Sequence, residues 1–270
     1  PPPLPILLNS NQIAYPSLLL RGAGTNGSTT FTDSSPNAFT VTAFGNAQIS
    51  TAQYPTGMSS SMYFDGSGDY LSVSSFTPAL ATTTTPFTIE GWVFYNSFPN
   101  GAGGCIFTSN YSSGNVPFAL SVSNGNVSYP GTASGTGYAW FGVFTGSAWQ
   151  GIVSSSAVIN LSTWFHIAVS YDGTTTRLFV NGSLVNSATS GITYQTSATT
   201  SGSKIGTDWG TGSSLNGYLS NVRFTNGTAL YRSNFTPPVL PASATPQTDL
   251  TPTTTASTVT NNVYGVYQLA

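Results

Sequence analysis

Turn-forming dipeptides divide the middle of the chain into short segments. Asn-Gly occurs six times and Asp-Gly twice, and each pair suits a tight turn in which a residue adopts a positive φ angle. The pairs begin at Asn26, Asp65, Asn100, Asn124, Asp172, Asn181, Asn216 and Asn226. A chain interrupted this often predicts hairpins.

The segments between these turns are rich in β-branched and aromatic residues, which favour strands. The predicted strands cover Ala38–Phe44, Ser61–Phe64, Phe87–Phe94, Pro117–Val122, Tyr138–Thr145, Trp164–Tyr171, Arg177–Val180 and Tyr218–Phe224. No window combines an apolar spacing of 3.6 residues with helix formers and caps. The sequence therefore predicts an all-β fold.

The segment Trp164–Tyr171 shows how such strands pack. Phe165, Ile167, Val169 and Tyr171 alternate with Trp164, His166, Ala168 and Ser170, so one face is strongly apolar and the other is mixed. A dozen or so strands of this kind in one sheet would leave an apolar face in water. We therefore expect a two-sheet antiparallel sandwich.

Proline and threonine mark both ends of the chain. Residues 1–13 hold four prolines in the first five positions and predict an extended arm. Residues 14–237 form the predicted sandwich, and residues 238–270 form a second, Pro/Thr-rich arm. The expected organisation is one domain with two extended arms.

Charge is scarce in this sequence. Asp, Glu, Lys and Arg make up 4% of 270 residues, against about 25% in an ordinary domain, and the net charge is −2. The five basic residues are scattered, which argues against nucleic acid as a partner, and the absence of a run of roughly 20 apolar residues argues against membrane insertion. A weakly charged surface suits a protein that is fixed in an assembly.

Four segments, in order, carry a resemblance to a known family: SMYFDGSGDYLSV, PFTIEGWVFYN, TWFHIAVSYDGTTTRLFVNGSLV and KIGTDWGTGSSLNGYLSNVRFTNGTALY. This ordered set resembles the laminin-G-like, concanavalin-A-like jelly-roll superfamily, over about residues 15 to 237. The resemblance implies that the sandwich is a jelly roll.

Two further segments, TFTDSSPNAFTVTAFGNAQIS and SNVRFTNGTALYRSNFTPP, are similar to the version of this domain found in tailed-phage virion proteins. This implies a structural or adhesive component of a virion, either a head-decoration protein or a tail fibre or spike, on the particle surface. Its arms would anchor it to other virion subunits or to further copies of itself. The alternative is a carbohydrate-binding, lectin-like module that recognises a host-surface glycan, with or without calcium.

The resemblance also directs attention to calcium, which many laminin-G-like domains hold at the rim of the sandwich. Asp65 and Asp69 place two carboxylates on one glycine-rich turn. The alternative, which we favour, is that Asp65 and Asp69 fix the turn by side-chain bonds to the backbone, as Asp residues in turns often do. We expect no required cofactor, and calcium at Asp65 and Asp69 is the candidate metal site.

Sugar recognition requires aromatic rings that can lie against a pyranose face. Trp209, Tyr138, Trp140 and Trp149 are the candidates, whereas Trp92 and Trp164 are assigned to packing.

Catalysis is not expected. Glucanases of this superfamily use two glutamates on one strand, and Glu90 is the only glutamate here. His166 is the only histidine and fits a structural role within the sheet, while Cys105 has the apolar neighbours of a buried, unreactive thiol.

Overall fold

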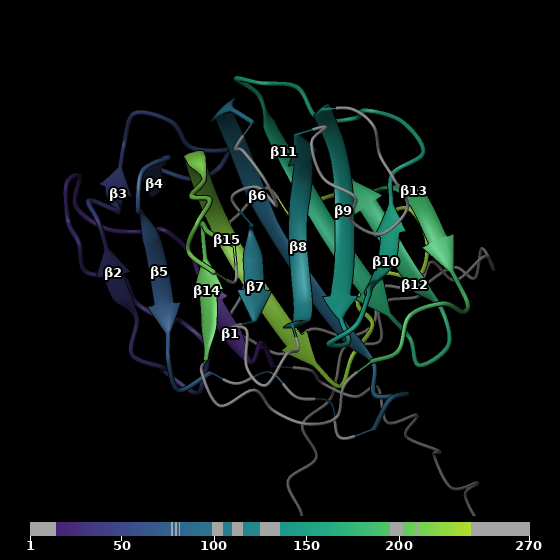
Figure 1. Ribbon diagram of the computed structural model, residues 1–270. Coiled ribbons are helices and arrows are strands. Elements are labelled where there is room, and N and C mark those ends of the chain that lie inside the picture. Colours follow the sequence, from purple (N-terminus) through teal and green to yellow (C-terminus); the bar gives the residue numbers. More distant parts are fainter. Residues whose placement is uncertain are drawn as a thin grey trace, which may run out of the picture.

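Two antiparallel sheets form the domain, as expected from the turn pattern (Figure 1). The computed structural model describes residues 15–76, 78, 80, 82–98, 105–109, 116–124, 136–194, 202–208 and 210–238. Every regular element in these ranges is a strand, and none of the described residues belongs to a helix that could cross a membrane. Apart from Pro238, the two predicted arms lie outside the described residues.

The first sheet has eight strands. In spatial order it contains β13 (Ser183–Ala188), β12 (Thr176–Val180), β11 (Trp164–Tyr171), β6 (Phe87–Ser97), β15 (Asn216–Asn226), β4 (Ser61–Asp65) and β3 (Gln48–Ser50), and β1 (Leu18–Leu20) also pairs with β15.

The second sheet has seven strands. Its order is β10 (Trp149–Val153), β9 (Thr136–Phe144), β8 (Val116–Asn124), β7 (Phe107–Ser109), β14 (Ser203–Ile205), β5 (Tyr70–Val73) and β2 (Thr42–Phe44).

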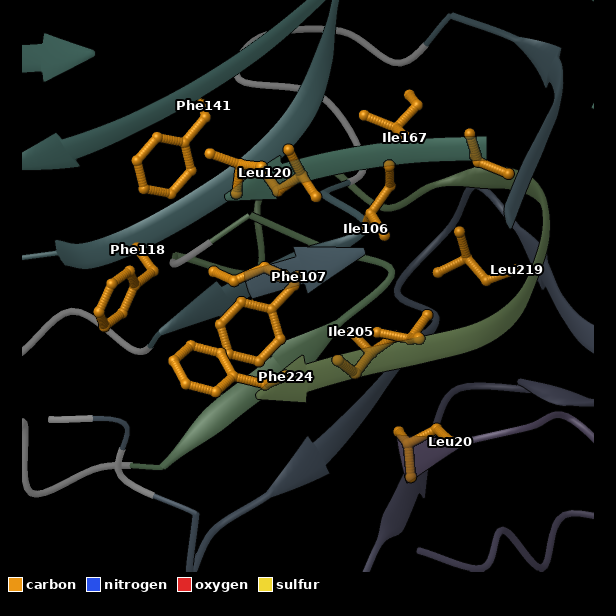
Figure 2. Packing of buried hydrophobic residues seen from close by; sticks show 14 of the residues in the cluster. Leu20, Ile106, Phe107, Phe118, Leu120, Phe141, Ile167, Ile205, Leu219 and Phe224 are labelled. Carbon is orange, nitrogen blue, oxygen red and sulfur yellow. The ribbon is translucent and has the colours of Figure 1, made fainter. Parts of the chain in front are cut away.

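The core lies between the sheets and is strongly aromatic (Figure 2). Phe224 of β15 lies at its centre, with ring centroids 5.4 Å from Phe118 and 5.6 Å from Phe107 on the opposite sheet. Phe165, Ile167, Val169 and Tyr171 all belong to this core, which confirms the apolar face predicted for β11. The other face of β11 therefore points away from the second sheet.

Local hydrogen bonding corrects two predictions. Ala38 does not begin a strand, because Asp33 accepts hydrogen bonds from the backbone of Ser35 and Phe39 and closes a loop in which Ala38 has a φ of 47°. Asn216–Gly217 does not form a hairpin turn either. These two residues begin β15. The register between β15 and β6 shifts between Asn216 and Gly217, and Gly217 has a φ of 152° at this irregularity.

The chain after β15 returns across the outer face of the eight-stranded sheet. We call residues 227–238 the C-terminal strap. Leu230 N donates to Thr88 Oγ1 at 2.9 Å, and Thr88 Oγ1 donates to the carbonyl of Thr228 at 3.0 Å. Farther along, Phe235 N donates to the carbonyl of Gly182 at 2.9 Å. The strap thus covers a sheet face that the second sheet does not reach.

Gly182 explains why the strap can lie so close. It follows Asn181 in the turn between β12 and β13, and both residues have positive φ, as the Asn-Gly pair predicts. A Cβ atom at Gly182 would lie 1.9 Å from the carbonyl oxygen of Phe235. Glycine is therefore needed here both for the turn and for the contact with the strap.

Candidate functional site

A buried polar cluster lies between the eight-stranded sheet and the strap. Glu90 of β6 pairs with Arg223 of β15, and its other oxygen accepts hydrogen bonds from Tyr231 Oη at 2.7 Å and His166 Nε2 at 3.0 Å. Arg223 also donates to Tyr231 Oη at 3.2 Å. Each of the four side chains is at most 2% exposed. The cluster is sealed from solvent.

The electrostatics of this cluster suit a structural role. Burial alone would raise the pKa of Glu90, but the Arg223 charge and the hydrogen bonds from His166 and Tyr231 outweigh it and lower the pKa to about 2. Glu90 is therefore a carboxylate at neutral pH, and the strap keeps it from contact with a substrate. His166 is likewise buried against Glu90, in agreement with its predicted place within the sheet.

Of the candidate calcium residues, Asp65 ends β4 and Asp69 lies on the connection from β4 to β5, which passes from one sheet to the other. Asp69 is fully buried and accepts hydrogen bonds from Asp65 N at 2.8 Å and from Asn46 N at 2.7 Å. Asp65 accepts from Ser67 N at 2.7 Å. Since Asn46 lies on the connection from β2 to β3, Asp69 joins two loops that each cross between the sheets.

These contacts leave few free ligand atoms for a metal ion. Calcium prefers six to eight oxygen ligands, and three of the four carboxylate oxygens of Asp65 and Asp69 already accept backbone hydrogen bonds. Within the described ranges no three His, Cys, Asp or Glu residues come together as a metal site. Burial also raises the pKa of the Cys105 thiol, which is fully enclosed and unreactive. The geometry favours the turn-holding role of the two aspartates.

The predicted sugar-binding residues divide into two groups. Tyr138, Trp140 and Trp149 lie on neighbouring strands β9 and β10, whereas Trp209 lies outside the described residues. Ala139, Phe141 and Val143 of β9 point into the core, so the alternate residues of β9 point outward. The structure thus brings three of the four candidates to the outer side of the seven-stranded sheet.

One further ring that the sequence analysis missed joins this group. Phe144 pairs with Trp149 across the β9–β10 ladder, with ring centroids 5.4 Å apart, and Trp140 meets Trp149 edge to face at 5.9 Å. The alternation of β9 carries the signal for Phe144, since it lies four residues after Trp140. We call Tyr138, Trp140, Phe144 and Trp149 the aromatic face.

Burial differs across the aromatic face. Trp140 is 3% exposed and packs with Val116 and Ala119, while Tyr138, Phe144 and Trp149 are half-buried. Trp140 therefore supports the group from below, and the other three rings have surface that a ligand can contact. By contrast, Trp92 and Trp164 project from the opposite sheet, where Trp92 Nε1 donates to the carbonyl of Pro238 at 3.0 Å. Both pack on the outer side of that sheet and not between the sheets.

Comparison with known proteins shows the family of this chain. The profile of the concanavalin A-like lectin/glucanase superfamily, in its laminin G form, matches residues 65–231. The chain belongs to this superfamily. The match runs from the last residue of β4 to Tyr231 in the strap.

Solved structures with the same fold include domain 4 of AbnA, an extracellular arabinanase of Geobacillus stearothermophilus, in complex with arabinotriose. It is 14% identical, with a TM-score of 0.55, and the match covers 81% of this chain and 95% of that one. The binding domain of Paraclostridial Mosquitocidal Protein 1 is 12% identical, with a TM-score of 0.56, and the match covers 80% and 50%.

The binding domain of botulinum neurotoxin serotype D is 14% identical, with a TM-score of 0.54 and coverage of 80% and 49%. The chain thus spans about half the length of the toxin binding domains that it matches. A search of curated protein sequences finds no match. At these identities the structural similarities establish the concanavalin A-like fold.

We expect acid to weaken this superfamily member through Glu90. Folding lowers the Glu90 pKa from 4.5 to about 2, so the unfolded state binds the proton more tightly. Glu90 therefore contributes to the free energy of unfolding above pH 4.5. This contribution, about 3 kcal/mol, is lost as the pH falls from 4.5 towards 2.

The measurement is urea unfolding between pH 7 and pH 2.5 on the natural protein and on Glu90→Gln. The variant leaves Arg223 buried without its counter-charge, so we expect it to lose about 3–5 kcal/mol at pH 7 and to show a flatter pH dependence. Equal pH dependence in the two proteins would show that Glu90 is not the responsible group.

A second prediction concerns Asp69. Asp69→Asn replaces one acceptor oxygen by an NH₂ group and leaves a buried backbone N–H without a partner, at a cost of about 1–3 kcal/mol. Adding 1 mM CaCl₂, roughly the concentration that extracellular modules sense, should leave the melting temperature unchanged. A calcium-dependent rise in the natural protein that disappears in both Asp65→Asn and Asp69→Asn would instead establish a metal site.

Proposed function

We propose that this protein is a non-catalytic carbohydrate-binding module and that it holds its ligand on the aromatic face. The observation that carries the proposal is the arrangement of Tyr138, Phe144 and Trp149 as half-buried rings on two paired strands, supported by the buried Trp140. Rings held in this way lose little freedom on binding and offer flat apolar surfaces to a sugar ring.

Rigid placement supports the proposal. Trp149 and Phe144 form a cross-strand pair, and Trp140 packs edge to face against Trp149, so two ring contacts hold the Trp149 ring in place. The ring faces of a sugar are apolar and match flat aromatic side chains that are held in this way.

The fold and the acids support the absence of catalysis. The only glutamate of the chain is paired with Arg223 and covered by the strap, so it is not available as an acid or a nucleophile. Glycoside hydrolysis by the usual route needs two carboxyl groups that flank the substrate. Among solved relatives in fold, domain 4 of the arabinanase is a domain in complex with arabinotriose, which makes a neutral pentose oligosaccharide a reasonable first probe.

Trp149→Ala should weaken glycan binding by about tenfold or more, because it removes the central ring of the aromatic face. Binding is measured by isothermal titration calorimetry with a panel of neutral oligosaccharides that includes arabinotriose. Trp164→Ala is the matched control, since it removes a half-buried tryptophan from the other sheet. Equal losses in the two variants, or no binding of any panel member by the natural protein, would contradict the aromatic face as the site.

A second candidate function is a structural or adhesive role in a tailed-phage virion. The observation that favours it is the scarcity of charge, since only 4% of residues are charged and the buried Glu90–Arg223 pair removes two of those charges from the surface. Electrostatic repulsion between neighbouring copies is therefore weak, and the copies can pack together. The two functions are compatible, because a module on a particle surface can also bind a host glycan.

If this role holds, the chain sediments with intact particles and stays bound after a wash in about 1 M NaCl, because weakly charged contacts are insensitive to salt screening. The measurement is mass spectrometry of gradient-purified particles before and after the wash. Recovery of the chain only in the particle-free fraction would refute the virion role and leave the proposed glycan binding untouched.

A further inference from the structure

The eight-stranded sheet contains a notch that neither proposed function uses. On one edge of β15, Leu219 pairs with Met62 of β4, while Val222 pairs with Leu20 of β1. The two partner strands therefore share one edge of β15. Between them the β15–β6 register shifts, and Asn221 adopts a φ of 51°. The notch is the place where one partner strand ends and the next begins.

Arg21 lies at this notch because it directly follows β1. Its carbonyl accepts hydrogen bonds from Ser220 Oγ at 3.1 Å and from Asn221 N at 3.4 Å, which fixes its backbone against the irregular part of β15. Its side chain lines two neighbouring cavities. The larger, of about 210 Å³, is also lined by Ala23, Gly57, Met58, Ser59 and Ser60, and the smaller, of about 140 Å³, lies towards Phe31 and Ile49.

Arg21 lacks the acidic partner that other arginines of this domain have. Arg223 pairs with Glu90 and Arg177 pairs with Asp172. Within the described part of the chain, no carboxylate oxygen lies within 4.0 Å of the Arg21 guanidinium, and its Nε is buried without a hydrogen-bond partner. A buried donor of this kind carries a desolvation penalty that a bound acceptor would remove.

A buried acceptor without a partner accompanies this donor. Asn221 is 2% exposed, and its Oδ1 has no hydrogen-bond partner. Its Nδ2 lies 3.5 Å from the sulfur of Met58, which lines the larger cavity. Asn221 lines neither of the two cavities, so the group that a ligand in them can meet is the unpaired cation of Arg21. A ligand for this cation must carry an oxyanion.

We propose that this Arg21 notch binds the oxyanion group of an acidic sugar, either a carboxylate or a sulfate ester. The guanidinium fork matches the two oxygens of either group. Ser59 and Ser60 add hydroxyls to the wall of the larger cavity. The choice of a sugar as carrier rests on the proposed glycan binding, whereas the oxyanion site itself rests on Arg21.

The test is calorimetric titration at low ionic strength with sodium glucuronate, glucose 6-sulfate, glucose and sodium sulfate. We expect at least one of the two acidic sugars to bind about tenfold or more tightly than glucose, since charge-assisted bonds to Arg21 are the difference. The stronger of the two identifies the carboxylate or the sulfate ester. Equal binding of glucose, or binding of inorganic sulfate alone, would overturn the proposal.

Variants separate this site from a general effect of charge. Arg21→Ala should abolish the preference for the acidic sugar, whereas Arg232→Ala, which removes the same charge from an exposed position, should leave it within about twofold. Because the Arg21 side chain makes no hydrogen bond with the described residues, its loss should not unfold the domain. Equal losses in both variants would overturn the proposal.

Two more variants keep the test decisive. Arg21→Lys retains the charge but lacks the fork and Nε, so a loss of about threefold or more is expected from geometry alone. Trp149→Ala should leave acidic-sugar binding unchanged, because Trp149 lies on the other sheet. If Trp149→Ala abolishes neutral-glycan binding and acidic sugars still bind, both sites stand. If neutral glycans bind and no Arg21-dependent binding of acidic sugars is found, the notch proposal is wrong and the proposed glycan binding on the aromatic face stands.

Discussion

The packing of the strap against the outer face of the eight-stranded sheet depends on the ion pair between Glu90 and Arg223. It joins β6 to β15, the two central strands of the eight-stranded sheet, on the face that does not meet the other sheet. A charge pair is costly to place away from water unless its remaining hydrogen-bonding groups are also satisfied. Tyr231 of the strap satisfies them from above and His166 from the neighbouring strand. The strap is therefore part of the domain's stability and not a loose extension of it.

The sequence was most informative where one face of a strand is buried. The alternation in Trp164–Tyr171 predicted both the bounds of β11 and its core face, because burial imposes a strict period of two. It was least informative where a single side chain reorganises the backbone. The carboxylate of Asp33 closes the loop at Ala38 through contacts that no local propensity records. The short strand β14 is defined by pairing with β5 and β7, about 100 residues or more before it in the sequence, and its own three residues carry little signal.

The candidate sites follow the same rule. Tyr138, Trp140 and Trp149 were predictable as a group because they alternate along a hairpin, and Phe144 belongs to the same pattern. The Arg21 notch was not predictable, since it exists only because β1 and β4, which are separated by some 40 residues, share one edge of β15. The two surfaces also differ in chemistry. One offers apolar rings on the seven-stranded sheet, and the other offers a single cation on the eight-stranded sheet.

The pairing of β1 with β15 affects how the domain can fold. Leu20 and Val222 lie side by side although about 200 residues separate them along the chain. Contacts of such long sequence separation raise the contact order, and the entropy of closing the loop must be met before the pair contributes any stability. On a ribosome, the eight-stranded sheet stays incomplete until β15 has emerged, and its central charges stay hydrated until Tyr231 follows. During that interval the aromatic core strands are exposed, so newly made chains should depend on chaperones far more than the finished domain does.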